Sequence, residues 1–582
     1  MAFDLVVRGG ELADGDGGPV RQADVAVQMG RIVAVGKVAG HGKQELDARG
    51  KLVTPGFVDI HTHYDGQATW DSRLQPSSWH GVTTAVMGNC GVGFAPVRPQ
   101  HHDRLIALME GVEDIPGAAL HEGLSWQWQD FGSYLDTLDS QPRDMDIAAQ
   151  LPHGALRLFV MGERGARLEQ ATPDDLRQMR QLSADAMRAG AIGFSTSRSV
   201  NHRAVNGDPT PSLRATEDEL LAIAMGLHDA GSGVLQCISD FTTPSLDAEF
   251  SMLERLVQAS GRPLSFSLAQ RYSAPEHWRV LLSRVDLAQA NGLPIVAQVA
   301  PRPIGVLLGL QGSRNPFSGC ASYRAIAPLP LAQRLVLLHQ PTLRARLLVE
   351  LGSASRDPLI PHVRGPSGHG QYDPFDRIYA FGDPPDYAPP PEQAVSAIAR
   401  QRGQTSADAA YDMLLDGGGK GFLFAPFANY AAGNLDACHS MLAHPHTVPG
   451  LGDGGAHVSI ISDGSFPTYL LSHWGRDRAS GRFDIGWLVK RQTADTARTV
   501  GLLDRGRVAP GYKADLNVID MAKLRLDAPV MAADLPAGGH RLLQRAQGYE
   551  ATIVSGVITY QHGEATGALP GRLVRGRQRM PA

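Results

Sequence analysis

Eight short apolar segments alternate with helical stretches through most of this chain, and this alternation limits the possible folds more than any other feature. Such a pattern is typical of βα units, in which consecutive strands lie parallel. Pro173–Ala189 and Thr216–Asp229 are two of the amphipathic helical stretches. Eight βα units predict a closed (β/α)8 TIM-like barrel of the α/β class, with an open doubly wound sheet as the alternative. The predicted strands begin at Gly56, Gly81, Met145, Gly190, Gly233, Pro263, Pro294 and Thr447.

Both ends of the chain have a different pattern, with short alternating strands instead of βα units. Residues 3–40 contain two such runs that meet at Met29-Gly30, and residues 551–560 turn at Ser555-Gly556. Because chain termini are often close in space, we expect the two ends to form one small β-sandwich beside the barrel. The predicted domains are 1–55 and 501–582 for this composite sandwich and 56–500 for the barrel.

The stretch between the seventh and eighth predicted strands, about 302–446, is too long for one crossover. Part of it, Gly365–Gln393, is rich in Pro, Gly and Asp. We therefore predict an inserted lid region over the barrel mouth, where substrate selection often occurs. An insertion without a function is the alternative.

Composition argues against several classes of protein. The net charge is −5, from 54 Lys and Arg against 59 Asp and Glu, and no basic run suggests nucleic acid or an anionic membrane as a partner. The amino terminus lacks a signal-peptide pattern, and no window approaches ~18 uninterrupted apolar residues. Four cysteines are too few for a disulfide framework in a chain of 582 residues. A cytoplasmic protein is expected, and a homo-oligomer is possible.

The chemically most informative residues follow the first and last predicted barrel strands. His61 and His63 stand two residues apart in FVDIHTH, so both imidazoles leave a strand on one face. Asp453 ends the eighth strand, and His457 follows it. Barrel enzymes work at the carboxyl ends of their strands, where two imidazoles and a carboxylate suit a catalytic divalent metal. The alternative for the histidine pair alone is two neighbouring surface residues.

Such a metal would lower the pKa of a bound water, so that hydroxide is available to attack near neutral pH. Asp453 would accept the proton from this water and return it to the leaving group. These residues therefore predict a metal-dependent hydrolase.

Several motifs resemble the amidohydrolase superfamily: TPGFVDIHTH, GVTTAVMGNCG, GAIGFST, GLGDGGAHV and the terminal RGRVAPGYKADLNVID. Within it, GNCG, LSWQWQDFGSYLDTL and GAIGFST resemble the N-acyl-D-amino-acid deacylase (D-aminoacylase) family. The resemblance extends from Asp4 to about Arg572. It implies metal-dependent hydrolysis of an amide that is not a peptide bond.

The resemblance also implies a set of metal ligands. His61, His63 and Asp453 match family ligands, and Cys90 matches a ligand cysteine, with a buried structural thiol as the alternative. The family's two further histidines, at the ends of strands five and six, are absent here. Cys237 aligns with the first and could replace it as a ligand, or it could be a core cysteine.

A second metal therefore has little support in the sequence. Many superfamily members bridge two metals through a carboxylated lysine of the barrel, but this chain has no lysine between Lys51 and Lys420. We expect one divalent ion per chain, with Zn²⁺ as the preferred metal.

The predicted substrate is a small amide that carries a carboxylate, as an N-acyl-amino acid does. Guanidinium binds carboxylate with two matched hydrogen bonds. Candidate substrate-binding residues are Arg198, His202 and Arg203 after strand four and Arg302 after strand seven, with an ordinary solvated loop as the alternative. His457 could polarise the scissile carbonyl or orient Asp453.

Three other functions stay open. The same metal chemistry would open a cyclic amide, an imide or a lactone, because the mouth loops decide the substrate. The altered positions on strands five and six could also mark a non-amide bond cleavage. The third is a non-catalytic scaffold, although such a protein would have no need for metal-type residues at one rim.

Overall fold

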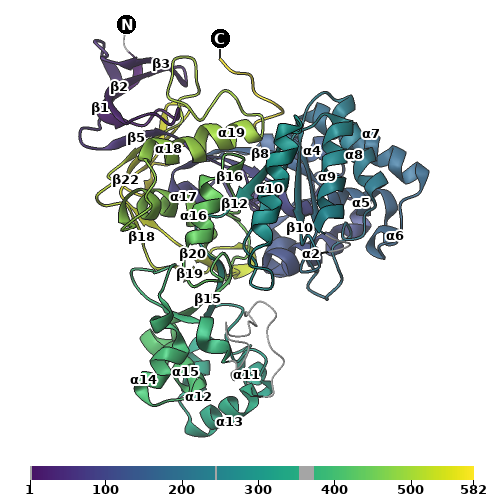
Figure 1. Cartoon of the computed structure of the whole chain (residues 1–582), viewed down its shortest axis with the longest axis vertical. Coiled ribbons are helices and arrows are strands. Elements are labelled where there is room, and N and C mark those ends of the chain that lie inside the picture. Colours follow the sequence, from purple (N-terminus) through teal and green to yellow (C-terminus); the bar gives the residue numbers. More distant parts are fainter. Residues whose placement is uncertain (1–2, 243–245, 353–372, 582) are drawn as a thin grey trace.

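The computed structural model describes residues 3–242, 246–352 and 373–581, and its centre is an eight-stranded parallel sheet. The strands follow one another in the sheet in chain order, so each βα unit places its strand beside the preceding one. The sheet curls into a barrel, which confirms the predicted fold class (Figure 1). Each predicted strand is present: β6 (Phe57–Asp59), β7 (Val82–Met87), β8 (Asp146–Pro152), β9 (Gly193–Arg198), β10 (Val234–Ser239), β11 (Leu264–Leu268), β12 (Ile295–Val299) and β16 (Thr447–Pro449).

The barrel closes between its first and last strands only at their carboxyl ends. In the described part of the chain, β6 and β16 share no ladder, but Thr62 and Gly454 form an isolated parallel bridge. The amide of Asp453 donates to the carbonyl of His61 at 3.0 Å, and the amide of His63 donates to the carbonyl of Gly454 at 2.8 Å. These backbone bonds bring the HTH motif and Asp453 together, although they are almost 400 residues apart.

The helices surround the barrel, and local sequence determines where they begin and end. Thr172 caps α7 (Pro173–Ala189) through a capping box with Asp175, Pro173 stands at its first position, and Gly190 ends it with a φ of 120°. α7 has the predicted bounds, and α8 (Glu217–Asp229) begins one residue later than predicted. The other principal helices are α2 (His102–Glu113), α3 (Gly117–Gly123), α4 (Phe131–Asp139), α5 (His153–Met161), α9 (Leu246–Ser260), α10 (His277–Ala290), α16 (Asp436–Ala443), α17 (Phe466–Ser472), α18 (Ile485–Lys490) and α19 (Thr496–Thr499).

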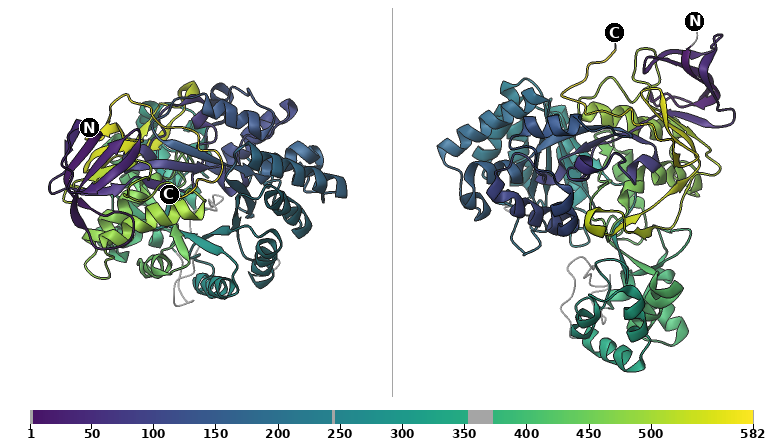
Figure 2. Two further views of the ribbon diagram at one scale, coloured as in Figure 1. Left: turned by 90° about the horizontal axis from the view of Figure 1, so that it is seen from above. Right: turned by 180° about the vertical axis from the view of Figure 1, so that it is seen from behind.

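Strands from both ends of the chain pair in a single nine-stranded sheet beside the barrel. Two of its hairpins turn where the sequence predicted, at Met29-Gly30 and Ser555-Gly556, and all four residues have positive φ. Both termini lie on this side of the molecule (Figures 1 and 2). The strands are β1 (Phe3–Leu12), β2 (Arg21–Gln28), β3 (Arg31–Gly36), β4 (Gly42–Asp47), β5 (Leu52–Pro55), β17 (Leu516–Ile519), β22 (Tyr549–Val554), β23 (Val557–Gln561) and β24 (Glu564–Ala565).

The insertion between β12 and β16 forms a lobe with its own apolar core. It projects from the barrel (Figure 1), and the residues after β15 connect it to the barrel mouth, where the amide of Asn429 donates to the carbonyl of Gln270 at 2.8 Å. Of the predicted lid segment Gly365–Gln393, residues 365–372 lie outside the described residues. The lobe contains β13 (Ile304–Gly309), β14 (Tyr379–Phe381), β15 (Phe422–Ala428), α11 (Ala321–Ile326), α12 (Leu331–Leu338), α13 (Pro341–Leu351), α14 (Val395–Arg402) and α15 (Ser406–Gly419).

None of the helices that the structure describes has the length and apolar character needed to cross a lipid bilayer.

Candidate metal centre

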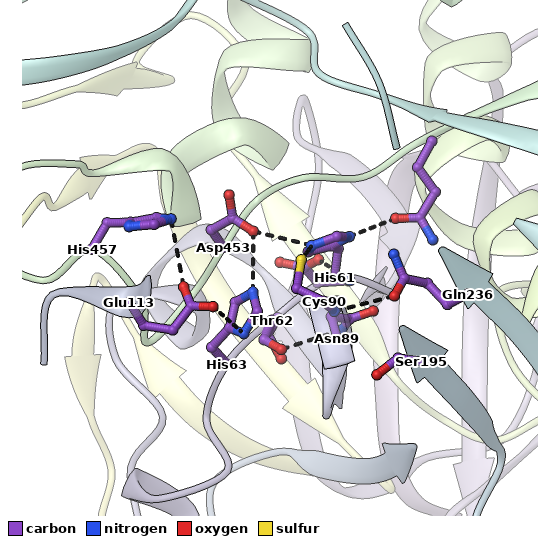
Figure 3. Close-up of polar contacts among 12 residues, drawn as sticks. His61, Thr62, His63, Asn89, Cys90, Glu113, Ser195, Gln236, Asp453 and His457 are labelled. Carbon is purple, nitrogen blue, oxygen red and sulfur yellow. Dashed lines mark hydrogen bonds and ion pairs between the residues drawn. The ribbon is translucent and has the colours of Figure 1, made fainter. Parts of the chain in front are cut away.

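His61 and His63 leave the end of β6 and point at one position inside the barrel mouth (Figure 3). Both are about 1% exposed, so neither is a surface histidine. Their Nε2 atoms lie 3.3 Å and 3.5 Å from the same oxygen, Oδ1 of Asp453. The two imidazoles and the carboxylate therefore converge as the sequence predicted.

The second nitrogen of each imidazole has a partner that determines the tautomer. Nδ1 of His61 lies 2.7 Å from Oε1 of Gln298, and the amide of Gln298 is oriented by donation from Nε2 to Oγ of Ser265. His61 therefore carries its proton on Nδ1 and presents an Nε2 lone pair. Nδ1 of His63 lies 3.3 Å from Oε1 of Glu113, which favours the same tautomer. Partners of this kind orient histidine ligands in metal sites.

Cys90 supplies a fourth donor beside the two imidazoles. Its Sγ is 3.3 Å from Nε2 of His61, and the donor atoms of His61, His63 and Cys90 all lie within 4.8 Å of one another. A left-handed backbone, with φ of 55°, turns Cys90 into the barrel, and its amide donates to Oε1 of Gln236 at 3.1 Å. Burial raises the pKa of the thiol to about 11, so binding of a metal would release a proton from it.

Asp453 completes the donor set and is ionised. Burial opposes the charge, but the adjacent His63 and His61 lower the pKa of this carboxyl well below its usual range. Two imidazoles, a thiol and a carboxylate fit a divalent metal such as zinc, which accepts nitrogen, sulfur and oxygen ligands.

Cys237 does not join this group, contrary to its prediction as a metal ligand. Gln236 points into the barrel, because it accepts from the amide of Cys90, and successive strand residues face opposite sides. Cys237 therefore faces the helices, where it is buried in the main apolar core and burial raises its pKa. It is a core cysteine, the alternative left open by the sequence.

The predicted substrate-binding arginines already have partners. Arg198 is paired with Glu249, and Arg302 is fully buried with Nη2 3.0 Å from Oδ1 of Asp463. Arg203 is exposed and donates to two backbone carbonyls. The structure thus does not favour a role in carboxylate binding for Arg198 or Arg302, because both guanidinium groups already contact an acidic side chain of the protein.

His202 is the member of the same loop that lies near the metal centre. Burial and the charges of His457 and His63 lower its pKa to about 3, so it is neutral. Oγ of Ser197 accepts from the amide of Ser199 at 3.3 Å and lies 2.9 Å from Nδ1 of His202. Among the described residues, this Nδ1 is the acceptor that faces the hydroxyl of Ser197. His202 would then carry its own proton on Nε2 and could donate it to a substrate oxygen.

Sequence reasoning missed Glu113, the last residue of α2. It is 1% exposed, and its two oxygens contact His63 and His457, the latter at 3.5 Å to Nε2 (Figure 3). An acidic residue at the carboxyl end of a helix opposes the helix dipole, and this was the available signal.

Comparison with known proteins identifies the family. The profile of the Amidohydrolase family matches residues 44–560 of the chain. The chain belongs to the amidohydrolase family. It is 27% identical to a D-aminoacylase of Alcaligenes xylosoxydans xylosoxydans, over 98% of this chain and 97% of that protein. It is 30% identical to an N-acyl-D-glutamate deacylase of the same organism, over 52% of this chain and 57% of that one.

Solved structures share the fold. A crystal structure of D-aminoacylase has a TM-score of 0.64 and 23% identity, and covers 99% of this chain and 100% of its own. An N-acyl-D-glutamate deacylase of Bordetella bronchiseptica, complexed with zinc and a phosphonate inhibitor, has a TM-score of 0.64, 21% identity and the same coverage. The predicted superfamily is confirmed, and the protein is a metal-dependent hydrolase of carbon–nitrogen bonds other than peptide bonds.

Proposed function

We propose that this amidohydrolase removes the acyl group from N-acyl-amino acids of D configuration and uses one Zn²⁺ ion per chain. The observation that carries the proposal is the convergence of four donor atoms, from His61, His63, Cys90 and Asp453, at the barrel mouth. The nearly full-length similarity to a D-aminoacylase supports the substrate class. Cytoplasmic location and a homo-oligomer stay predictions.

Strand geometry supports one metal in preference to two. Ile238 follows Gln236 by two residues on β10, so it also faces the barrel interior. On β11, Ser265 accepts from Gln298 inside the barrel, so Ser267 faces inward as well. The inward positions at these two strand ends therefore hold an isoleucine and a serine, which are poor ligands for a second zinc.

Each residue of the site has a separate role in the proposed reaction. A bound divalent ion would lower the pKa of a water and polarise the substrate carbonyl. Asp453 lies where it can accept a proton from the attacking water and transfer it to the departing amine. His457 and His202 stand beside this position as further groups that can contact substrate oxygens.

The first test combines elemental analysis with a substrate panel. We expect about one zinc per chain and faster hydrolysis of N-acetyl-D-amino acids than of their L enantiomers. The panel should include acidic and apolar side chains, together with hydantoins and lactones as cyclic substrates. Hydrolysis of cyclic substrates alone would replace the proposal with the cyclic-amide alternative, and about two metals per chain would contradict the single-metal site.

The two barrel cysteines offer a matched pair of variants. Cys90→Ser should lower zinc affinity at least about tenfold, because serine oxygen is a poorer zinc ligand than thiolate sulfur. Cys237→Ser makes the same chemical change at a buried position that faces the helices, so zinc affinity should stay within about twofold. Competition with a chromogenic chelator measures both affinities. Equal effects of the two substitutions would show that Cys90 is not a ligand.

A further inference from the structure

Glu113 lies at a position where a negative charge lowers the stability of the fold. It lies at the carboxyl end of α2, where the helix dipole disfavours negative charge, and it is 1% exposed. A buried carboxylate destabilises a fold unless other groups compensate its charge. Among the described residues, the titratable side chains in contact with it are the imidazoles of His63 and His457, at 3.3 Å and 3.5 Å.

The contact with His63 acts on the metal centre. Oε1 of Glu113 faces Nδ1 of His63 at 3.3 Å, so this carboxylate favours a proton on Nδ1 and leaves Nε2, 3.5 Å from Oδ1 of Asp453, as the nitrogen that a metal would take. A carboxylate behind a ligand histidine fixes the ring and makes it a stronger ligand.

The contact with His457 orients the segment that follows β16 at the barrel mouth. Oε2 of Glu113 faces Nε2 of His457, and the carbonyl of Glu113 accepts from the amide of His457. The next residue, Asp114, binds the amide and the hydroxyl of Ser459 through its carboxylate. The end of α2 therefore holds the segment from His457 to Ser459, in which His457 has a left-handed φ of 48°. That conformation is unfavourable for a residue with a side chain and persists only where surrounding contacts impose it.

We propose that Glu113 is a positioning residue shared by the metal ligand His63 and the rim residue His457. One carboxylate orients the ligand and holds His457 beside the metal position (Figure 3). The role of His457 in turnover rests on the proposed deacylase function, whereas the role of Glu113 toward the metal does not.

The test is the zinc affinity of Glu113→Gln, which keeps the size of the side chain and removes its charge. We expect affinity to fall by about 10- to 100-fold, the usual effect of losing a carboxylate behind a ligand histidine. Glu113→Asp should recover part of the loss, because it restores the charge on a shorter side chain. His457→Ala should leave zinc affinity within about twofold and lower kcat/KM.

Glu219→Gln is the matched control. Glu219 is also a fully buried acid in contact with a histidine, since its Oε1 lies 2.9 Å from Nε2 of His153. It should lower thermal stability at least as much as Glu113→Gln does, because Glu219 also pairs with the buried Arg157, and it should leave zinc affinity unchanged. A purely structural role for Glu113 predicts the same result for both variants.

The shared role is tested by combining Glu113→Gln with His457→Ala. If Glu113 acts on turnover partly through His457, the double variant will lose less kcat/KM than the product of the two single fold-losses. Zinc affinity equal to that of the wild type in Glu113→Gln would overturn the proposal even if the protein is a deacylase. A lower affinity in a protein that hydrolyses no N-acyl-amino acid would instead contradict the proposed function and support the role of Glu113.

Discussion

Replacing Asp453 with asparagine is expected to lower kcat by about 10²- to 10⁴-fold, the usual contribution of a positioned general acid–base. The amide keeps the size of the side chain and an oxygen that can face His61 and His63, but it cannot accept and return a proton. Zinc content should therefore stay near one ion per chain while turnover is lost. Elemental analysis and initial rates on the best N-acyl substrate measure the two quantities separately.

Asp144→Asn provides the control for changing a buried aspartate. Asp144 precedes β8 and accepts from the hydroxyl of Tyr560 at 2.7 Å, in a contact with the composite β domain. Its kcat should stay within about twofold of the wild type. A zinc-loaded Asp453→Asn enzyme with more than about a tenth of wild-type turnover would remove Asp453 from the proton-transfer role.

Replacing both His61 and His63 with alanine should remove the metal. The substitution deletes two of the four donors, and a four-ligand zinc site is worth roughly 10–16 kcal/mol in total. We expect less than about 0.1 zinc per chain and no measurable turnover, with the secondary structure unchanged by circular dichroism.

His153→Ala is the comparison for this double variant. His153 is also fully buried, but it contacts Glu219 and Thr196 instead of the metal centre. This variant should be less stable than the wild type but should bind the same amount of zinc. If the double variant bound as much zinc as the wild type, the metal would have to lie elsewhere.

Much of the fold was predictable because it depends on short-range patterns. Apolar runs and amphipathic stretches located all eight barrel strands and the bounds of α7, since burial of one face imposes a period on the sequence. The turns at Met29-Gly30 and Ser555-Gly556 were predictable for the same reason.

The candidate site was only partly predictable. The HTH motif could be interpreted locally, because alternate residues of an extended chain share a face, and Asp453 could be placed at the same end of the barrel from the predicted fold. The sequence could not show whether the Cys237 side chain faces the barrel interior or the helices, because a shift of one residue along a strand exchanges its two faces. Arg198 and Arg302 looked available in the sequence, but each donates a hydrogen bond to an acidic side chain, Glu249 and Asp463, that is 51 and 161 residues away in the sequence.

The sequence by itself determined the class of fold, the pair of histidine donors and the aspartate beside them, because each follows from residue type and local spacing. Only the tertiary structure decided which cysteine joins them, which arginines are already paired and that Glu113 stands behind His63 and His457. These are contacts between side chains from different elements, and no local period of the sequence encodes them. Their geometry comes from barrel closure, which joins the end of β6 to the residues after β16 by backbone hydrogen bonds.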